Sequence, residues 1–442
     1  MKKGFVKIVK AKIPWVSHVI DDEKIASDLY SLRLQIPQRS MCVECRGSKL
    51  LCGKRTCPVL VRAYSFAKIK PFLKKEICGS SPPSVFIGRV GYPYVYAGPL
   101  VPPVVGDTSL YDMPELWLDK TFEDIINFRF KLIRGKFLVN VKRPQSTRFM
   151  EYTKELAMSK GPAEAELVLK REPTYNLVLD SEVQPIGPSG LVESININNV
   201  KTDQNIQKAY DDIDLKASEA IMMLYNKGVI FSKIEKAFSM GLFGLKKQRR
   251  LVPTRWSITA VDSIISNSNI DEIKDNPWLN EYRVYEYNHL DRKFLVLLIP
   301  DAWSYELIEV WYPNTMWNPN SDYIAICSDN EGYWGRTTYA SIGGCYYSAR
   351  LAVSEFLRAE KRQASAIVIS EAYPGHMMPI GVWEVRESIR EALKRMPERF
   401  DNLNQAMTYL STRLKTKVDK IIANSNVLKN IFRQEKLTKF LK

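Results

Sequence analysis

The chain has 442 residues, 45% hydrophobic and 26% charged, which is ordinary for a soluble globular protein and sufficient for two or three domains. Sixty-four Lys and Arg against 49 Asp and Glu leave a formal net charge of +15, which favours a polyanionic partner, most often nucleic acid, over a surface kept basic for solubility. The longest strictly apolar run, 294–299, is far too short for a membrane span, and the first ten residues lack the apolar core of a secretory signal. We therefore expect a soluble, cytoplasmic, nucleoid-associated protein with no membrane partner.

The first motif along the chain is a cluster of four cysteines. It comprises Cys42, Cys45, Cys52 and Cys57, spaced C-x2-C-x6-C-x4-C. Two pairs of thiolates can complete a tetrahedron around one ion, and four filled positions predict a structural Zn²⁺ rather than a catalytic one. An iron–sulfur cluster is the main alternative because four cysteines also hold those. Two disulfides between these cysteines are disfavoured in a reducing cytosol. Free thiols buried in a core are disfavoured because the neighbouring residues are polar.

Basic residues crowd around the cysteine cluster. Positions 39–75 hold ten Lys and Arg but one acidic residue, Glu44. A rigid basic element of this kind can contact phosphates, which predicts nucleic-acid contacts for Lys49, Lys54 and Arg55. The alternative is a solvated face that balances acidic residues elsewhere.

The next part of the chain combines β-prone runs with turn residues. Runs at 85–87 and 94–96 lie between glycines and prolines, which predicts compact strands and turns. Arg89 and Tyr92 fall in the glycine-rich turn between the runs. They form a weaker candidate for contacting a phosphate and a base.

Two further segments, 121–135 and 205–227, have helical spacing. The second contains Asp211 and Asp214, which are weak candidates for a divalent-ion site in phosphodiester cleavage. Adjacent acidic residues on a helix point in different directions, so a solvated face is the favoured alternative.

A basic strip followed by a tryptophan is the stronger nucleic-acid candidate. It consists of Lys246, Lys247, Arg249, Arg250, Arg255 and Trp256. Basic side chains can contact phosphates while the indole offers a stacking face. A buried Trp256, with the basic side chains lying along the surface, is the alternative.

Four strand-like runs then follow one another and predict an antiparallel meander. They are 284–287, 294–298, 307–311 and 323–327. A helix is expected from about 346 to 362, and a buried strand at 366–370. Glu371 and His376, near the end of that strand, could bind metal or share a proton, although such a pair more often satisfies hydrogen bonds in a loop. His289 is expected at a hairpin turn.

Beyond 382 the chain becomes helical and basic. Its apolar residues at amphipathic spacing are Leu403, Met407, Leu410, Leu414 and Ile421. The segregation of helices and antiparallel strands predicts an α+β fold with a mixed, largely antiparallel sheet, a small N-terminal zinc module and a helical C-terminal region. We expect its regions to be 1–75, 76–260, 261–381 and 382–430, followed by a tail at 431–442.

The tail carries a short apolar motif. Gln434, Leu437, Phe440 and Leu441 stand at i, i+3, i+6 and i+7. In a 3₁₀ turn the apolar members form a plug that can fill a partner's hydrophobic pocket. The pattern matches the peptide recognised by the PCNA sliding clamp, with Leu441 in place of the second aromatic residue. A last helical turn packed on the protein's own core is the alternative.

The cysteine element reads C-x2-C-x-G-S-K-x-L-C-G-x3-C-P over 42–58, and the clamp motif stands at 434–441. Together with segments 86–93, 98–103 and 252–257, they resemble the archaeal Nre family of DNA repair proteins. The resemblance implies a role in the response to DNA damage, zinc binding by the four cysteines and recruitment through PCNA. It brings no settled catalytic assignment with it.

The sequence therefore predicts a DNA repair factor that binds zinc and nucleic acid and is recruited by the sliding clamp. A metal-dependent nuclease acting on damaged or branched DNA is the alternative, and its weak catalytic candidates are the two aspartates, Glu371 and His376. RNA processing fits the charge and the zinc but leaves the terminal motif unexplained.

Overall fold

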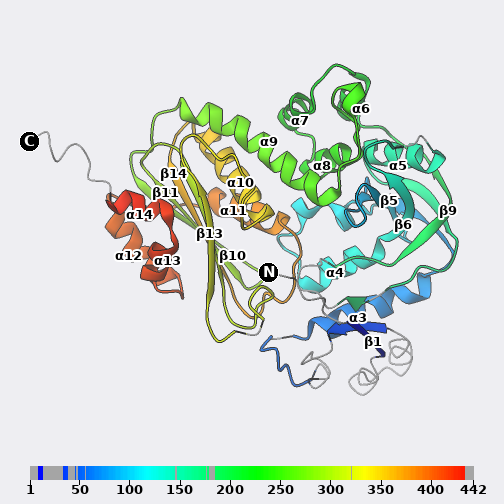
Figure 1. Ribbon diagram of the computed structural model, residues 1–442, viewed down its shortest axis with the longest axis horizontal. Coiled ribbons are helices and arrows are strands. Elements are labelled where there is room, and N and C mark those ends of the chain that lie inside the picture. The colour runs from blue at the N-terminus through cyan, green and yellow to red at the C-terminus, as the bar shows by residue number, and fades with distance from the viewer. Residues whose placement is uncertain are drawn as a thin grey trace, which may run out of the picture. The chain divides into compact units, whose positions relative to one another are not determined.

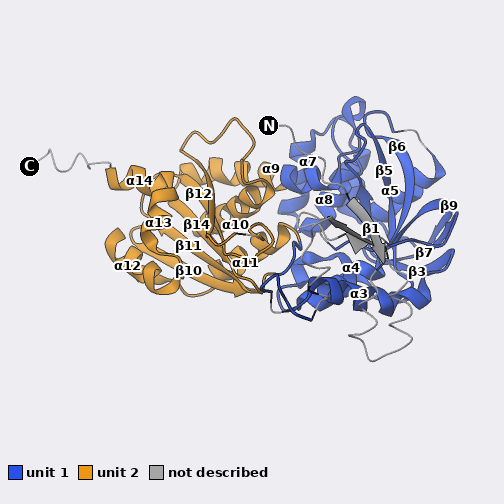
Figure 2. Cartoon of the chain, turned by 60° about the horizontal axis from the view of Figure 1, so that its bottom comes forward, with its two compact units in different colours: residues 1–261, 377–380 blue, residues 262–376, 381–442 orange. Residues whose placement is uncertain are grey.

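The computed structural model of the chain describes residues 45, 48–54, 56–144, 147–175, 185–319 and 321–433. It also gives the backbone of the small sheet β1 (Ile8–Lys12), β2 (Arg33–Pro37) and β8 (Leu177–Val178). The chain divides into two compact units: unit 1 holds 1–261 and 377–380, and unit 2 holds 262–376 and 381–442 (Figure 2). No helix in the described part is long and apolar enough to cross a membrane.

Unit 1 is built on a six-stranded mixed sheet with the order β3-β7-β9-β6-β5-β4. The strands are β3 (Glu76–Ser81), β4 (Val85–Ile87), β5 (Tyr94–Val101), β6 (Ile133–Asn140), β7 (Ala163–Leu169) and β9 (Ser189–Asn198). Only the β6–β9 pairing is parallel among these strands. The expected runs at 85–87 and 94–96 are thus confirmed as parts of two paired strands, β4 and β5.

The helices of unit 1 are α3 (Pro58–Ile69), α4 (Phe122–Lys131), α5 (Arg148–Met158), α6 (Gln204–Asp211), α7 (Ala217–Asn226) and α8 (Phe231–Ser239). Helix α4 begins at a capping box in which Thr121 and Asp124 satisfy each other's backbone amides. It ends before the position expected from the sequence because the β-prone residues from Ile133 onward enter strand β6. The segment expected to be helical at 205–227 contains two helices rather than one.

Helix α9 (Thr254–Lys274) contains the boundary between the units, since Val261 is the last residue of unit 1 before Asp262 begins unit 2. Its first turn is tied to strand β4, where the Ile87 amide donates to Thr254 Oγ1 at 2.9 Å. This bond fixes the position of the neighbouring residue pair Arg255–Trp256 relative to the sheet of unit 1.

Unit 2 contains a second six-stranded sheet with the order β13-β12-β14-β11-β10-β15. Its strands are β10 (Tyr282–His289), β11 (Arg292–Ile299), β12 (Ser304–Trp311), β13 (Ala325–Glu331), β14 (Ser365–Ala372) and β15 (Glu398–Phe400). The four expected strands exist, but the predicted meander is wrong in one respect. Strand β14 lies between β11 and β12 and runs parallel to β12. All eight residues of β14 are buried, as befits a central strand covered on both faces.

Helices cover both faces of this second sheet (Figure 1). Helices α10 (Gly344–Glu360) and α11 (Trp383–Lys394) pack on one face together with part of α9. The other face is covered by α12 (Leu403–Arg413), α13 (Val418–Asn424) and α14 (Asn426–Arg433). The apolar stripe expected beyond 382 is confirmed as core, although it is shared between α12 and α13 and the link that joins them. With two mixed sheets and helices on them, the α+β fold class is confirmed.

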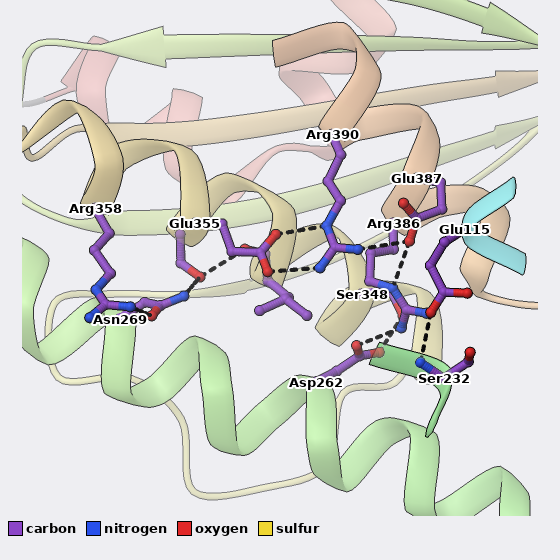
Figure 3. Close-up of polar contacts among 12 residues, drawn as sticks. Glu115, Ser232, Asp262, Asn269, Ser348, Glu355, Arg358, Arg386, Glu387 and Arg390 are labelled. Carbon is purple, nitrogen blue, oxygen red and sulfur yellow. Dashed lines mark hydrogen bonds and ion pairs between the residues drawn. The ribbon is translucent and has the colours of Figure 1, made fainter. Parts of the chain in front are cut away.

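Buried charged residues join the helices on one face of the unit 2 sheet (Figure 3). Asp262 of α9 accepts hydrogen bonds from Arg386 Nη1 at 2.9 Å and from Ser348 Oγ at 2.5 Å. Arg390 of α11 forms a bidentate pair with Glu355 of α10, with both distances 2.7 Å. Because the Asp262 and Arg386 side chains are almost fully buried, loss of one partner would leave an uncompensated charge.

Candidate nucleic-acid interface

Two aromatic residues that are far apart in the sequence meet on unit 1. The ring centroids of Tyr92 and Trp256 are 5.3 Å apart with a tilted geometry. Tyr92 lies in the turn before β5, which is closed by a bond from the Tyr94 amide to the Gly91 carbonyl at 2.9 Å. Gly91 has a φ of 84°, which glycine adopts readily. Trp256 is 47% exposed, so the alternative of a buried indole is wrong.

Exposed basic residues flank this aromatic pair. Lys142 Nζ lies 5.8 Å from the centroid of the Tyr92 ring. The Leu251 amide donates to the Val141 carbonyl at 3.0 Å and so brings the end of the basic strip to the segment that follows β6. We define the aromatic–basic surface as Arg89, Tyr92, Lys142, Arg143, Arg250, Arg255 and Trp256, all of them exposed. Two sequence candidates, predicted separately, thus belong to one surface.

The remaining members of the basic strip behave differently from one another. Lys246 and Lys247 are exposed on a 3₁₀ turn, Lys246–Gln248. Arg249 instead donates to three backbone carbonyls, those of Gly244, Tyr210 and Asp212, each at 2.7 Å. Two of these carbonyls lie at the C-terminal end of α6, where a cation is favourable. Arg249 is therefore engaged within the fold, and we leave it out of the surface.

Three of the four predicted zinc ligands are described. Cys45 and Cys57 are buried, Cys52 is half-buried, and Cys42 lies outside the described residues. The Leu51 amide donates to Cys45 Sγ at 3.4 Å. Cys57 immediately precedes α3. The chemistry of the described cysteines therefore fits a metal ligand set. Among described residues alone, no group of three potential ligands is assembled.

Other predicted residues of the two termini are placed only in part. Lys49 is exposed and Lys54 is half-buried, whereas Arg55 falls outside the described residues. The clamp motif Gln434, Leu437, Phe440 and Leu441 also lies outside them. The last described element before that motif is α14, which ends at Arg433.

The acidic candidates on unit 1 do not converge on a common point. Asp211 accepts a hydrogen bond from Gln207 Nε2 at 2.8 Å, within its own helix. Asp214 follows the helix and is held by its amide, which donates to Asp212 Oδ1 at 3.1 Å. Both side chains are exposed, as the alternative of a solvated face predicts.

Glu371 and His376 have separate partners. The buried carboxylate of Glu371 accepts hydrogen bonds from the Tyr373 hydroxyl at 2.6 Å and from the amides of Lys415 and Thr416 at 3.1 and 2.9 Å. His376 Nδ1 instead lies 3.1 Å from the Leu290 carbonyl oxygen and 3.6 Å from Glu384 Oε1. The two residues are neighbours in sequence, but the structure places His376 with a carboxylate of α11.

Unit 2 also contains a buried group of ionisable residues that no sequence motif indicates. We call it the buried His–Glu cluster: His289, Arg292, Glu309, His376 and Glu384. Glu384 Oε1 lies 3.3 Å from His289 Nδ1 as well as 3.6 Å from His376 Nδ1, and Arg292 Nη2 donates to Glu309 at 2.5 Å. His289 ends β10 directly before a hairpin turn, as predicted, and its Nε2 has no partner among the described residues.

Burial and charge set the ionisation of this cluster. Burial lowers the pKa of His376, which keeps the imidazole neutral. Burial also raises the pKa of Glu384, because it disfavours the charged carboxylate. The electrostatic and hydrogen-bond interactions with His376, His289 and Arg292 are stronger than this effect and hold the pKa of the carboxyl below its usual range. The sequence contains a carboxylate at the start of a helix, Glu384, and a histidine at the end of a strand, His289. These two residues are 95 positions apart, so the sequence alone does not indicate that they meet.

Comparison with known proteins assigns the family. The model of the archaeal Nre N-terminal region matches residues 51–318, and that of the archaeal Nre C-terminal region matches residues 331–440. The chain therefore belongs to the archaeal Nre family.

Three relatives of the chain are named DNA repair proteins. NreB of Archaeoglobus fulgidus is 40% identical over 401 residues, which cover 90% of this chain and all of NreB. NreA of the same organism is 39% identical over 85% of this chain and 94% of NreA, and NreA of Haloferax volcanii is 34% identical over 72% and 78%. No solved structure matches the chain significantly.

Proposed function

We propose that this protein is a DNA repair factor that binds nucleic acid through the aromatic–basic surface, holds a structural Zn²⁺ on its N-terminal cysteines and is recruited by the PCNA sliding clamp. The names of its relatives support a role in DNA repair. The observation that carries the nucleic-acid part is the contact between Tyr92 and Trp256, beside Lys142.

The chemistry of the surface suits a polyanion that has ring systems. Lysine and arginine side chains neutralise phosphates and release condensed counterions, which gives affinity without sequence preference. Aromatic rings stack on bases, and an exposed ring already beside another ring needs little rearrangement. The formal charge of +15 on the whole chain attracts the same partner over longer distances.

The nucleic-acid proposal is tested by titrating labelled DNA with the full chain and with Trp256→Ala. Loss of one stacking ring should weaken binding by about tenfold. Trp278→Ala in unit 2 is a matched control because Trp278 is also about half exposed, at 53%. Equal affinities for the Trp256 variant and the unchanged protein would remove the main support for this interface.

The zinc proposal rests on the cysteine spacing, on the buried Cys45 and Cys57 and on the amide directed at Cys45 Sγ. Cys42, Cys45, Cys52 and Cys57 would hold the ion, which would stabilise the turns between them. Elemental analysis should find about one zinc per chain and less in Cys57→Ser, with Cys78→Ser as the control because Cys78 is an exposed cysteine outside the motif. A brown, iron-containing protein would support the iron–sulfur alternative.

Clamp recruitment rests on the motif at 434–441, which directly follows α14. Calorimetry with the clamp of the same organism should show binding by the full chain and none by a chain ending at Arg433. Phe440→Ala should also abolish binding, whereas Thr438→Ala, at a position that the motif leaves open, should bind normally. Undiminished binding by the truncated chain would refute the role of the tail.

The nuclease alternative gains no specific support. Asp211 and Asp214 are exposed on unit 1, and the Glu371 carboxylate of unit 2 is engaged by three donors. His376 contacts Glu384 instead. The geometry therefore favours a binding role over metal-dependent cleavage by these four residues.

A further inference from the structure

The sheet of unit 1 presents an uncovered row of tyrosines next to the aromatic–basic surface. Tyr94 and Tyr96 alternate with buried residues along β5, and their exposed fractions are 58% and 45%. Leu138, which faces Tyr96 across the strand pair, is also exposed. Tyr94, Tyr96 and Leu138 therefore lie on one exposed face of the sheet, and Tyr92 lies in the turn that directly precedes this strand.

The strands hold these rings in place from behind. Val95 and Ala97, which alternate with the tyrosines, are buried in the core of unit 1. Tyr94 pairs with Asn140 and Tyr96 with Leu138 in the β5–β6 ladder. A ring on such a strand needs little further ordering when it binds a flat ligand, so the entropic cost of binding is small.

Charge on the same sheet changes from strand to strand. Lys136 of β6 lies over the Tyr96 ring, with Nζ 5.5 Å from the centroid. By contrast, strand β7 carries the exposed acidic residues Glu164 and Glu166, whereas Glu193 of β9 is paired with Lys75 at 2.8 Å. A phosphate backbone is therefore attracted to the β5–β6 side of the sheet and repelled from the β7 side.

We propose that Tyr92, Tyr94 and Tyr96, with Trp256, form a stacking platform for successive bases of single-stranded DNA. The inference rests on the proposed nucleic-acid interface and names its ligand. Alternate residues on a strand are about 6.8 Å apart, roughly twice the 3.4 Å step between stacked bases. Only a strand whose bases are separated from one another can place them on such a row. Duplex DNA keeps those base faces stacked inside the helix and exposes only its grooves and backbone.

The decisive experiment compares a fluorescent oligothymidine of about 20 nucleotides with a duplex of the same length, using the full chain and fluorescence anisotropy. The double variant Tyr94→Ala/Tyr96→Ala should bind the single strand at least about tenfold more weakly, because each stacked base contributes substantially to affinity. Duplex binding and the dependence of affinity on salt should not change, since no charge is removed.

Two variants control for other causes. Tyr94→Phe/Tyr96→Phe keeps both rings and should retain single-strand binding, whereas a role of the hydroxyl groups would make it as weak as the alanine variant and overturn the proposal. Tyr323→Ala removes an exposed tyrosine from unit 2 and should bind normally. Circular dichroism and the denaturation midpoint should confirm that the variants fold, as expected for exposed positions.

The possible failures are distinguishable. Wild-type binding to duplex DNA only, or an equal loss on both ligands in the alanine variant, would overturn the stacking platform but leave the proposed interface standing. A Trp256→Ala variant that binds every DNA as the unchanged protein does would count against the interface itself. Tighter binding of an oligouridine than of the oligothymidine would overturn the assignment to DNA.

Discussion

Polar and aromatic residues are used in opposite ways by the two units. On unit 1, the aromatic–basic surface exposes rings and cations that have few partners among the described residues. In unit 2, the buried His–Glu cluster encloses its charges and satisfies them almost entirely within the fold. An exposed ion pair contributes little to stability, whereas a buried one is costly to disrupt. The comparison indicates that substitutions should affect binding in unit 1 and stability in unit 2.

The largest effect is expected from Glu384→Ala. This substitution leaves the buried His289 and Arg292 without their shared carboxylate, which should reduce the free energy of unfolding by about 3–5 kcal/mol. Chemical denaturation measures the loss. Glu391→Ala is the matched control on the same helix, because Glu391 pairs with the exposed Lys394 and should cost less than about 1 kcal/mol. Similar losses in the two variants would show that burial does not separate them.

The second prediction contrasts two basic residues of unit 1. Arg249→Ala removes three bonds to backbone carbonyls and should lower the free energy of unfolding by about 2 kcal/mol without changing the salt dependence of DNA binding. Lys142→Ala should leave stability unchanged and reduce the slope of log affinity against log salt by about one. The reverse assignment of effects would mean that Arg249, not Lys142, contacts phosphate.

The smallest effect is a dependence of stability on pH. The pKa of His376 is lowered by burial from its usual 6.5, so the unfolded chain takes up a proton more readily than the folded one below that pH. The contribution of His376 to the free energy of unfolding should be constant above about pH 6.5. It should then fall by up to about 1.4 kcal/mol per pH unit as the solution is acidified. Glu384 acts in the same direction but only at lower pH, since its ordinary pKa is 4.5 and it is lowered further.

The His376 prediction is checked by denaturation between pH 8 and pH 5. His376→Gln cannot take up a proton there, so its stability should vary less over this interval than that of the unchanged protein. An identical pH profile for the two proteins would assign the effect to other groups.

The sequence predicted individual helices and strands, because these depend on the spacing of apolar residues within a short segment. The apolar stripe beyond 382 follows from helical periodicity, because one buried face imposes it, whereas strand β14 follows from a short continuous apolar run, the pattern of a strand buried on both faces. Helix α10 was also expected close to its observed range. The order of the strands does not follow from such spacing, since β14 enters the sheet between two strands that precede it in the sequence. Its neighbours are chosen by long-range packing, which a single sequence does not display.

The candidate site shows the same division. Composition predicted the chemistry of Tyr92 and Trp256, but not that β4 and the start of α9 bring them together. For His376, nearness in the sequence was misleading, because the favoured partner, Glu371, contacts Tyr373 and the segment after α12. Tyr94 and Tyr96 were part of an expected strand, and only the burial pattern shows that one face of it is open.

Helix α14 is anchored at its start by a buried carboxylate. Glu306 of β12 accepts bonds from the amides of Asn426 and Val427, at 2.9 and 3.2 Å, and from the hydroxyl of Ser425. Any peptide that leaves this helix therefore starts from a fixed point on unit 2. Phe440 follows Arg433 by seven residues, and a fully extended chain of that length reaches at most about 25 Å. A clamp bound at Phe440 would therefore lie within this short distance of unit 2. Unit 2 would then stay close to the DNA that the clamp encircles.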